Sequence, residues 1–149
     1  MFKHILLATD GSALSGTGAE VAIKTAKALG ARITAVHVTR AYDERQGYDG
    51  NAMPRMPELK KRFDANMAAA AKSILDAIKQ AAEKGKVTCE TVTAAGEDPY
   101  EMIIEQARKS KCDLIVMASH GRRGIQSILL GSESTKVLTH SEIPVLVVR

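Results

Sequence analysis

The sequence predicts a single-domain α/β protein, a three-layer α/β/α sandwich whose middle layer is a five-stranded parallel sheet. Three observations predict this fold class. Short β-rich segments alternate with longer segments of helical period along the whole chain. The segments ILLA and LIVMA are continuously apolar, as strands are when helices cover both of their faces. The length of 149 residues suits one domain with one core.

Five strands are expected. Each is a short run of β-branched and other apolar residues between polar or turn-forming ones. They span residues 4–9, 32–38, 87–93, 113–118 and 144–149.

Four helices are expected between the strands, the first two from residues that recur at helical spacing. The first ends before Gly30, and its stripe is Val21, Ala22, Thr25, Ala26 and Leu29. The second keeps one stripe for about six turns and ends at Gly85. Its stripe is Leu59, Phe63, Met67, Ala70, Ile74, Ile78 and Ala81.

The last two helices are predicted from the residues at their starts. Asp98 is the expected N-cap of the third helix, with Pro99 at its first position. Its buried residues are Ile103, Ile104 and Ala107. The fourth runs over about 132–139. The long connection at 40–57 has no period, so a surface loop is expected there, with a lid or a partner surface as the alternative.

Amino-acid composition and charge limit the classes of ligand that the protein is expected to bind. Aromatic residues are scarce, with three Tyr, two Phe and no Trp, which disfavours single-stranded nucleic acid as a ligand. The net charge of +4 is dispersed and favours a small phosphorylated ligand. The apolar run before Asp10 is too short for a signal peptide or a membrane span, so a cytoplasmic protein is expected. Cys89 and Cys112 lack metal-ligand spacing and read as buried free thiols.

In an open parallel sheet, ligands bind beyond the carboxyl ends of the strands, where the strand order reverses. The places to look therefore follow the first, second and fourth strands. Two phosphate-binding fingerprints fail there. The glycine spacing at 11–18 has Thr17 where a Walker loop needs lysine, and the spacing at 16–21 has Val21 where a dinucleotide fingerprint needs glycine.

The segment ASHGRRGIQSILLGS at 118–132 is a better candidate for anion binding. The segment has a glycine turn after a strand, then the apolar residues ILL, which can anchor it to the core, and then a second glycine at the start of a helix. Gly131 and Ser132 lie where unpaired amides and the helix dipole attract anions. Ser132 can cap the helix or bind phosphate, and Gly121 permits close approach of amides and a positive φ. The alternative is that the glycines only turn the chain and Ser132 only caps the helix.

Five stretches carry a resemblance at this point: ILLATDGS, AVHV, MASHGRRG, ILLGSES and IPVLVVR. Over essentially its whole length the chain is similar to the universal stress protein family. The nucleotide-binding branch of that family has the pattern Gly-x2-Gly-x9-Gly-Ser/Thr after its fourth strand. Here Gly121, Gly131 and Ser132 match it, and Ala118 replaces the first glycine. The resemblance implies sheet order 3-2-1-4-5 in a Rossmann-like, adenine nucleotide alpha hydrolase-like fold.

The resemblance also implies an ATP site, with or without Mg²⁺. Asp10 would lie on the nucleoside side, the Val38 backbone would bond adenine, and the triphosphate would lie along 119–121 and 131–133. The full candidate set is Ala8, Thr9, Asp10, Val38, Met117, Ala118, Ser119, His120, Gly121, Arg122, Arg123, Gly131, Ser132 and Glu133.

Several of these residues have a second interpretation. Asp10 could cap the first helix, a role that Ser12 could also take. Arg122 and Arg123 could pair with phosphates or simply be solvated. His120 could act as a base only beside a nucleophile or an activated water, and no carboxylate adjacent in sequence orients it. The carboxylate of Glu133 would repel phosphate, so only its amide is expected to contact it.

The sequence therefore predicts an ATP-binding regulatory protein with slow or absent hydrolysis, since no Walker lysine or pair of metal-binding carboxylates is evident. The alternatives are a weak ATPase or phosphotransferase using His120 or Ser132, and a non-nucleotide interaction protein. The apolar closing strand predicts edge pairing. The resemblance implies a homodimer through that strand, and its residues are Val145, Leu146, Val147 and Val148.

Overall fold

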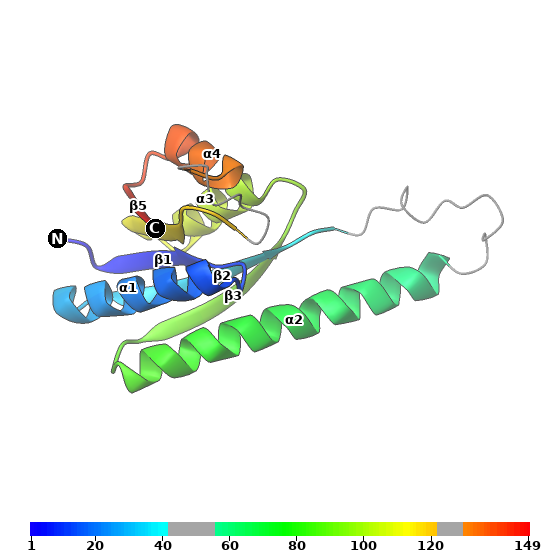
Figure 1. Ribbon diagram of the computed structural model, residues 1–149, viewed down its shortest axis with the longest axis horizontal. Coiled ribbons are helices and arrows are strands. Elements are labelled where there is room, and N and C mark those ends of the chain that lie inside the picture. The colour runs from blue at the N-terminus through cyan, green and yellow to red at the C-terminus, as the bar shows by residue number, and fades with distance from the viewer. Residues whose placement is uncertain (42–55, 122–129) are drawn as a thin grey trace.

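The computed structural model describes residues 1–41, 56–121 and 130–149, and strands alternate with helices throughout (Figure 1). Most of the predicted loop at 40–57, together with Arg122 and Arg123, lies outside the described residues. The elements are β1 His4–Ala8, α1 Ala13–Leu29, β2 Arg32–Thr39, α2 Met56–Lys84, β3 Cys89–Ala95, α3 Pro99–Lys109, β4 Leu114–Ala118, α4 Ser132–His140 and β5 Val145–Val148.

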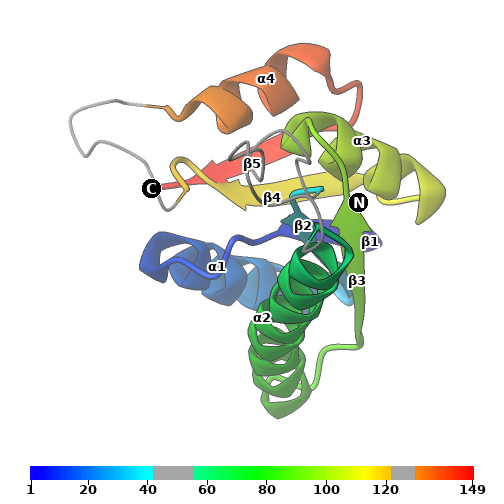
Figure 2. The same ribbon diagram turned by 90° about the vertical axis from the view of Figure 1, so that its right-hand side faces the viewer.

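All neighbouring strands pair in parallel, in the order β3-β2-β1-β4-β5, which confirms the predicted fold. Figure 2 shows α1 and α2 on one side of the sheet and α3 and α4 on the other. The two central strands, β1 and β4, are buried at every residue. Their continuously apolar sequences follow from this, because each has a strand on both edges and helices on both faces.

The buried face of α1 differs in part from the predicted stripe. Ala22 and Ala26 are buried as expected, but Val21 and Leu29 are only partly buried. Small residues take their place: a Cβ at Gly18 would lie 3.6 Å from the Ala118 amide nitrogen. The helix approaches β4 closely at Gly18, and Ile23 contributes a large side chain to the same buried face.

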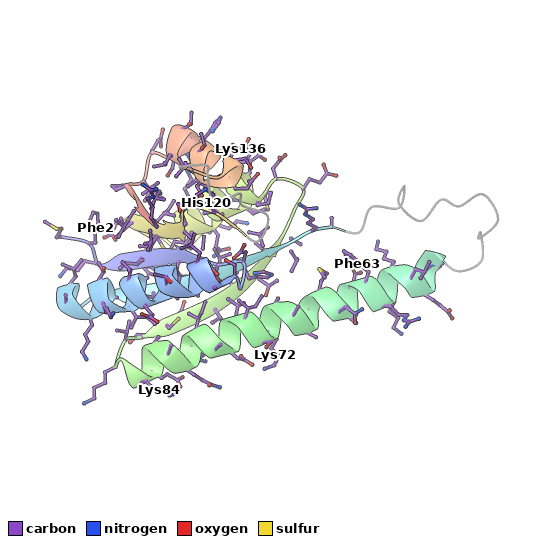
Figure 3. All side chains as sticks on the ribbon, in the orientation of Figure 1. Phe2, Phe63, Lys72, Lys84, His120 and Lys136 are labelled. Atoms are coloured by element: carbon purple, nitrogen blue, oxygen red, sulfur yellow. The ribbon has the colours of Figure 1, made fainter. Side chains whose placement is uncertain are left out.

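The predicted stripe of α2 is wrong along most of the helix: of its seven residues only Ile78 is deeply buried, and Leu59, Ala70 and Ala81 are exposed. The deeply buried residues are Ala71, Leu75, Ile78 and Ala82, all in the second half of the helix. Leu59 is 42% exposed. A helix of 29 residues is about 44 Å long, whereas strands of 7 or 8 residues reach only about 25 Å. The first half, which carries Phe63, therefore projects beyond the sheet (Figures 1 and 3).

Three helices end in left-handed residues. Gly30, Lys86 and Lys111 have φ of 64°, 59° and 54°, and the amide that follows each returns to the last turn of its helix. The left-handed conformation strains a residue that carries a Cβ by roughly 1–2 kcal/mol, so the two lysines are unfavourable there.

We expect Lys86→Gly and Lys111→Gly each to raise the free energy of unfolding by roughly 0.5–1 kcal/mol. Relief of strain exceeds the extra chain entropy that glycine loses on folding. Urea denaturation measures the change. Lys79→Gly, an exposed position inside α2, is the control and should lose about 1 kcal/mol. Stabilities for the two cap variants at or below that of the natural chain would contradict the assignment.

The two cysteines are buried and free, as predicted. Burial raises the pKa of the Cys112 thiol to about 12, so this thiol is unreactive at neutral pH. Across residues 1–41, 56–121 and 130–149, no three His, Cys, Asp or Glu side chains gather as a metal cluster would require. In the same residues, no helix combines the length and the apolar character needed to cross a membrane.

Candidate functional site

The candidate site is the crevice at the carboxyl ends of β1 and β4. Asp10 lies two residues after the end of β1, and Gly121 lies three residues after the end of β4. A Cβ built on Gly121 would lie 2.8 Å from Asp10 Oδ2, so the two residues face each other across the crevice. Gly121 does not have a positive φ, and the expected conformational reason for glycine is wrong. Close approach to the Asp10 carboxylate is the reason instead.

Ser12, and not Asp10, is the N-cap of α1. Ser12 Oγ accepts a hydrogen bond from the Ser15 amide at 3.2 Å. Asp10 Oδ1 accepts one from the Ser12 amide at 2.9 Å. The Asp10 side chain thus braces the turn that leads into α1, with its other carboxylate oxygen against Gly121.

The two ends of segment 118–132 are joined by hydrogen bonds. The Gly131 amide donates to the Ser119 carbonyl at 2.7 Å. The buried Ser134 hydroxyl lies 3.0 Å from the Ala118 carbonyl oxygen and 3.1 Å from that of Ser119. A Cβ on Gly131 would lie 3.0 Å from the Ser119 carbonyl oxygen, a tight contact that glycine avoids. The end of β4 and the start of α4 therefore form one surface.

The N-terminus of α4 lacks a capping side chain. Its N-cap is Gly131, in extended conformation, so Ser132 is the first helical residue and the alternative of Ser132 as N-cap is wrong. The first bond within the helix runs from the Thr135 amide to the Gly131 carbonyl. Among the residues the structure describes, the amides of Ser132 and Glu133 have no acceptor. These donors and the helix dipole favour an anion at this end.

The Glu133 side chain joins α4 to α3. Its Oε2 accepts a hydrogen bond from the Tyr100 amide at 3.0 Å, and its Oε1 lies 3.3 Å from Lys136 Nζ. It thereby caps α3, whose predicted N-cap Asp98 is in place but makes no side-chain cap bond. Lys136 also lies over the Tyr100 ring, 5.2 Å from its centroid. The carboxylate that would repel a phosphate is therefore paired elsewhere, which leaves the Glu133 amide for the crevice.

His120 lies at the end of β4, below α4 and its Lys136 (Figure 3). Its Nδ1 lies 3.0 Å from the Ser119 hydroxyl. Its Nε2 is buried and has no hydrogen-bond partner within the described residues. No hydrogen bond to a carboxylate orients the ring in that part of the chain. As a catalytic base, His120 therefore gains no support from this geometry.

Four further candidates lie at the ends of β1 and β4 with buried side chains: Ala8, Thr9, Met117 and Ala118. The Thr9 hydroxyl is already bonded to Ser15 Oγ and to the Gly11 amide. Ala118, which replaces the first glycine of the family pattern, does not have a positive φ, so its methyl group causes no backbone strain.

The backbone of Val38 is open toward β1. The Thr9 amide donates to the Val36 carbonyl, and in a regular parallel ladder the next bond would run from the Val38 amide to the Thr9 carbonyl. The next would run from the Gly11 amide to the Val38 carbonyl. Neither forms: the Thr9 carbonyl is bonded to His37 Nδ1 at 2.8 Å, and the Gly11 amide to the Thr9 hydroxyl at 3.2 Å.

Val38 therefore presents an amide donor and a carbonyl acceptor that lack partners among the described residues. Sequence reasoning missed His37, Tyr100 and Lys136 around the site. Histidine in a strand and lysine on a helix carry no local signal of the partners they contact.

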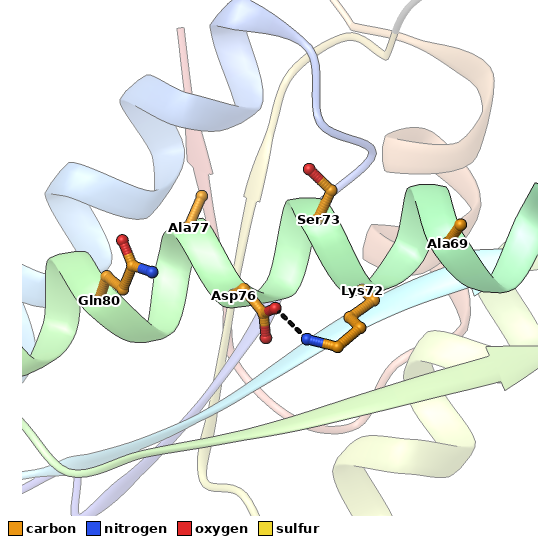
Figure 4. A pocket seen from close by; sticks show the side chains of 6 residues that line it. All are labelled: Ala69, Lys72, Ser73, Asp76, Ala77 and Gln80. Carbon is orange, nitrogen blue, oxygen red and sulfur yellow. Dashed lines mark hydrogen bonds and ion pairs between the residues drawn. The ribbon is translucent and has the colours of Figure 1, made fainter.

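Two hollows lie away from this crevice. One, of about 510 Å³, runs along the outer surface of α2 and includes Lys72 and Asp76, which pair with each other (Figure 4). All of its lining residues come from this single helix, so no groups converge on it from different elements. The other, of about 370 Å³, lies between α2 and the ends of β2 and β3, and includes Thr39, Arg40 and Lys60. Neither includes a predicted site residue.

The fold and the crevice together define the class: a doubly wound α/β protein with its candidate site at the β1–β4 switch point. The chain belongs to the universal stress protein family, whose family model matches residues 1–149. A universal stress protein of Thermus aquaticus is 38% identical over 150 residues, with both chains covered completely.

Solved structures share the fold. The Methanocaldococcus jannaschii protein MJ0577 is 28% identical, with a TM-score of 0.78 over 99% of this chain and 96% of that one. A universal stress protein from Archaeoglobus fulgidus in complex with dAMP is 17% identical, with a TM-score of 0.70 over 100% and 98% of the two chains. The second likeness concerns the fold alone.

Proposed function

We propose that this chain is a cytoplasmic regulatory protein of the stress response that binds ATP in the crevice between β1 and β4. The observation that carries the proposal is the uncapped N-terminus of α4. The amides of Ser132 and Glu133 lie there without acceptors in the described chain, and the Gly131 amide donates to the Ser119 carbonyl just after β4. Main-chain amides at a helix N-terminus bind phosphate without a lysine.

The base would lie on the other side of the crevice, at Val38. Its open amide and carbonyl match the ring nitrogen and the exocyclic amino group of adenine, which accept and donate respectively. Asp10, between these two ends, would lie beside the ribose or beside a magnesium ion that the phosphates share, because Mg²⁺ is commonly held by one or two carboxylates together with nucleotide phosphates. The relative solved with dAMP supports an adenine nucleotide as a ligand of this fold.

Equilibrium dialysis with labelled ATP tests the proposal, and saturable binding by the folded protein is the expected result. Mass spectrometry of nucleotide released from the purified protein would distinguish ATP from ADP and AMP. Release of inorganic phosphate, measured on the same samples, would report any hydrolysis. Absence of binding at millimolar ATP would refute the proposal.

We further propose a homodimer in which β5 pairs with β5 of a second copy. β5 is an edge strand with β4 as its one neighbour in the described sheet, and Leu146 on it is 38% exposed. An apolar edge of this kind readily pairs with another strand. A two-fold contact would bury the same surface on both copies.

The variant Leu146→Asp is expected to be monomeric in sedimentation velocity at concentrations where the natural chain is dimeric. The substitution would add a carboxylate to each of the two paired apolar strand edges, while the core should be unaffected because this side chain is exposed. Leu138→Asp, on the exposed side of α4, is the matched control and should stay dimeric. A dimeric Leu146→Asp variant would move the interface to another surface.

A further inference from the structure

We propose that His37 is a positioning residue for recognition of the base. Its ring N–H donates a hydrogen bond to the Thr9 carbonyl and so keeps the Val38 amide free for a ligand. This inference rests on the proposed function for its ligand. The bond on which it depends is a property of the protein alone, at 2.8 Å between His37 Nδ1 and the Thr9 oxygen.

Successive residues of β2 direct their backbone hydrogen bonds alternately toward β1 and toward β3, and this alternation shows which neighbour the Val38 amide faces. The Arg32 amide bonds to Lys3, and the Val36 carbonyl accepts from Thr9, so even-numbered residues of β2 pair toward β1. Odd-numbered residues pair toward β3, as the Ile33 amide does with the Thr88 carbonyl. Val38 is therefore directed at the β1 side, where Thr9 is its natural partner.

The His37 ring replaces that partner. A partly buried carbonyl without a hydrogen-bond donor destabilises the folded state. Without the His37 ring, the Thr9 carbonyl would therefore accept a hydrogen bond from the nearest free donor. That donor is the Val38 amide, one ladder position away. Loss of the ring would thus extend the β1–β2 ladder by one bond and remove the donor that the base needs.

The open backbone also sets the class of base. Adenine presents a ring nitrogen that accepts and an amino group that donates, which matches the Val38 amide and carbonyl. Hypoxanthine has a ring N–H and a carbonyl at the corresponding positions, so it would set donor against donor and acceptor against acceptor. A site that depends on hydrogen bonds rejects such a mismatch strongly. We therefore expect ATP to be preferred over ITP, and the preference to depend on His37.

Two variants separate the positioning role from a packing role. His37→Leu fills the space without a donor. In His37→Asn, the side-chain amide nitrogen lies near the place of Nδ1 and can keep the bond to Thr9. Amide hydrogen exchange at Val38, measured by NMR on nucleotide-free protein, reports the ladder directly. ATP and ITP dissociation constants report the consequence for binding.

In the natural chain and in His37→Asn, the Val38 amide should exchange fast. In His37→Leu it should be protected at least about tenfold, ATP should bind about tenfold more weakly, as expected for one hydrogen bond, and the preference for ATP over ITP should shrink. A protected Val38 amide in the natural chain would overturn the inference. So would His37→Leu behaving like the natural chain in both exchange and binding, or a His37→Leu phenotype that His37→Asn shares.

The exchange measurement keeps this inference separable from the proposed function. If the natural chain binds no nucleotide, the ATP proposal fails. Fast exchange at Val38 that becomes slow in His37→Leu would still establish that His37 holds the ladder open. If His37→Leu does not fold, His37→Phe, which also lacks a donor, takes its place with the same expected results.

Discussion

The Gly121→Val variant is expected to lose most of its ATP binding while remaining folded. The first added carbon would lie 2.8 Å from Asp10 Oδ2, so the Asp10 carboxylate must leave its place beside Gly121. The rest of the valine side chain would occupy the crevice itself. Overpacking costs about 1–3 kcal/mol, which is roughly 5- to 150-fold in dissociation constant when the strain falls on the binding site. Equilibrium dialysis with labelled ATP measures the loss.

Gly16→Val is the matched control. Gly16 lies in α1, and a Cβ there would meet no atom within 4 Å. It receives the same substitution on an exposed helical surface away from the crevice, so ATP affinity should be unchanged. Tight ATP binding by Gly121→Val would place the nucleotide outside the β1–β4 crevice. Loss of binding in both variants would point to a general effect of the substitution.

The largest loss of stability is expected from Ile115→Ala. Ile115 has no exposed surface. It is the second residue of β4 and lies beneath α3 and α4. Truncation removes buried apolar surface and leaves a cavity, which together lower the free energy of unfolding by about 2–5 kcal/mol. For one domain of ordinary stability this is a large fraction of the total. Urea denaturation monitored by circular dichroism measures it.

Leu138→Ala provides the comparison, since Leu138 is 42% exposed on α4. A change within about 0.5 kcal/mol is expected, as for most surface substitutions. Equal losses in the two variants would contradict the assignment of Ile115 to the core between the sheet and the second helix layer. Neither substituted residue belongs to the crevice. Under conditions where both variants are folded, their ATP affinities should therefore match that of the natural chain.

Most of the fold could be predicted from the sequence. Continuous apolar runs identified β1 and β4, and Gly30 and Pro99 marked a helix end and a helix start where the structure has them. These features depend on neighbours in the chain. The projection of α2 could not be predicted, because a helical stripe indicates a face but not how much of that face the sheet is long enough to cover.

The candidate site divides in the same way. The end at which we propose an anion was expected from glycine and serine at the start of a helix, and the structure has α4 beginning at Ser132. The bracing partners could not. Glu133 bonds to an amide 33 residues away and His37 to a carbonyl 28 residues away.

The sequence by itself determined the order of strands and helices, the family, and the position of Gly131 and Ser132 at the start of the last helix. Helical period, apolar runs and caps are written in residues that lie close together along the chain. Only the tertiary structure decided that Gly121 meets the Asp10 carboxylate, that Glu133 is turned to α3 and that Val38 is open toward β1. Those contacts depend on which strands lie side by side, in what register, and where their ladder stops, and no local pattern of residues fixes that.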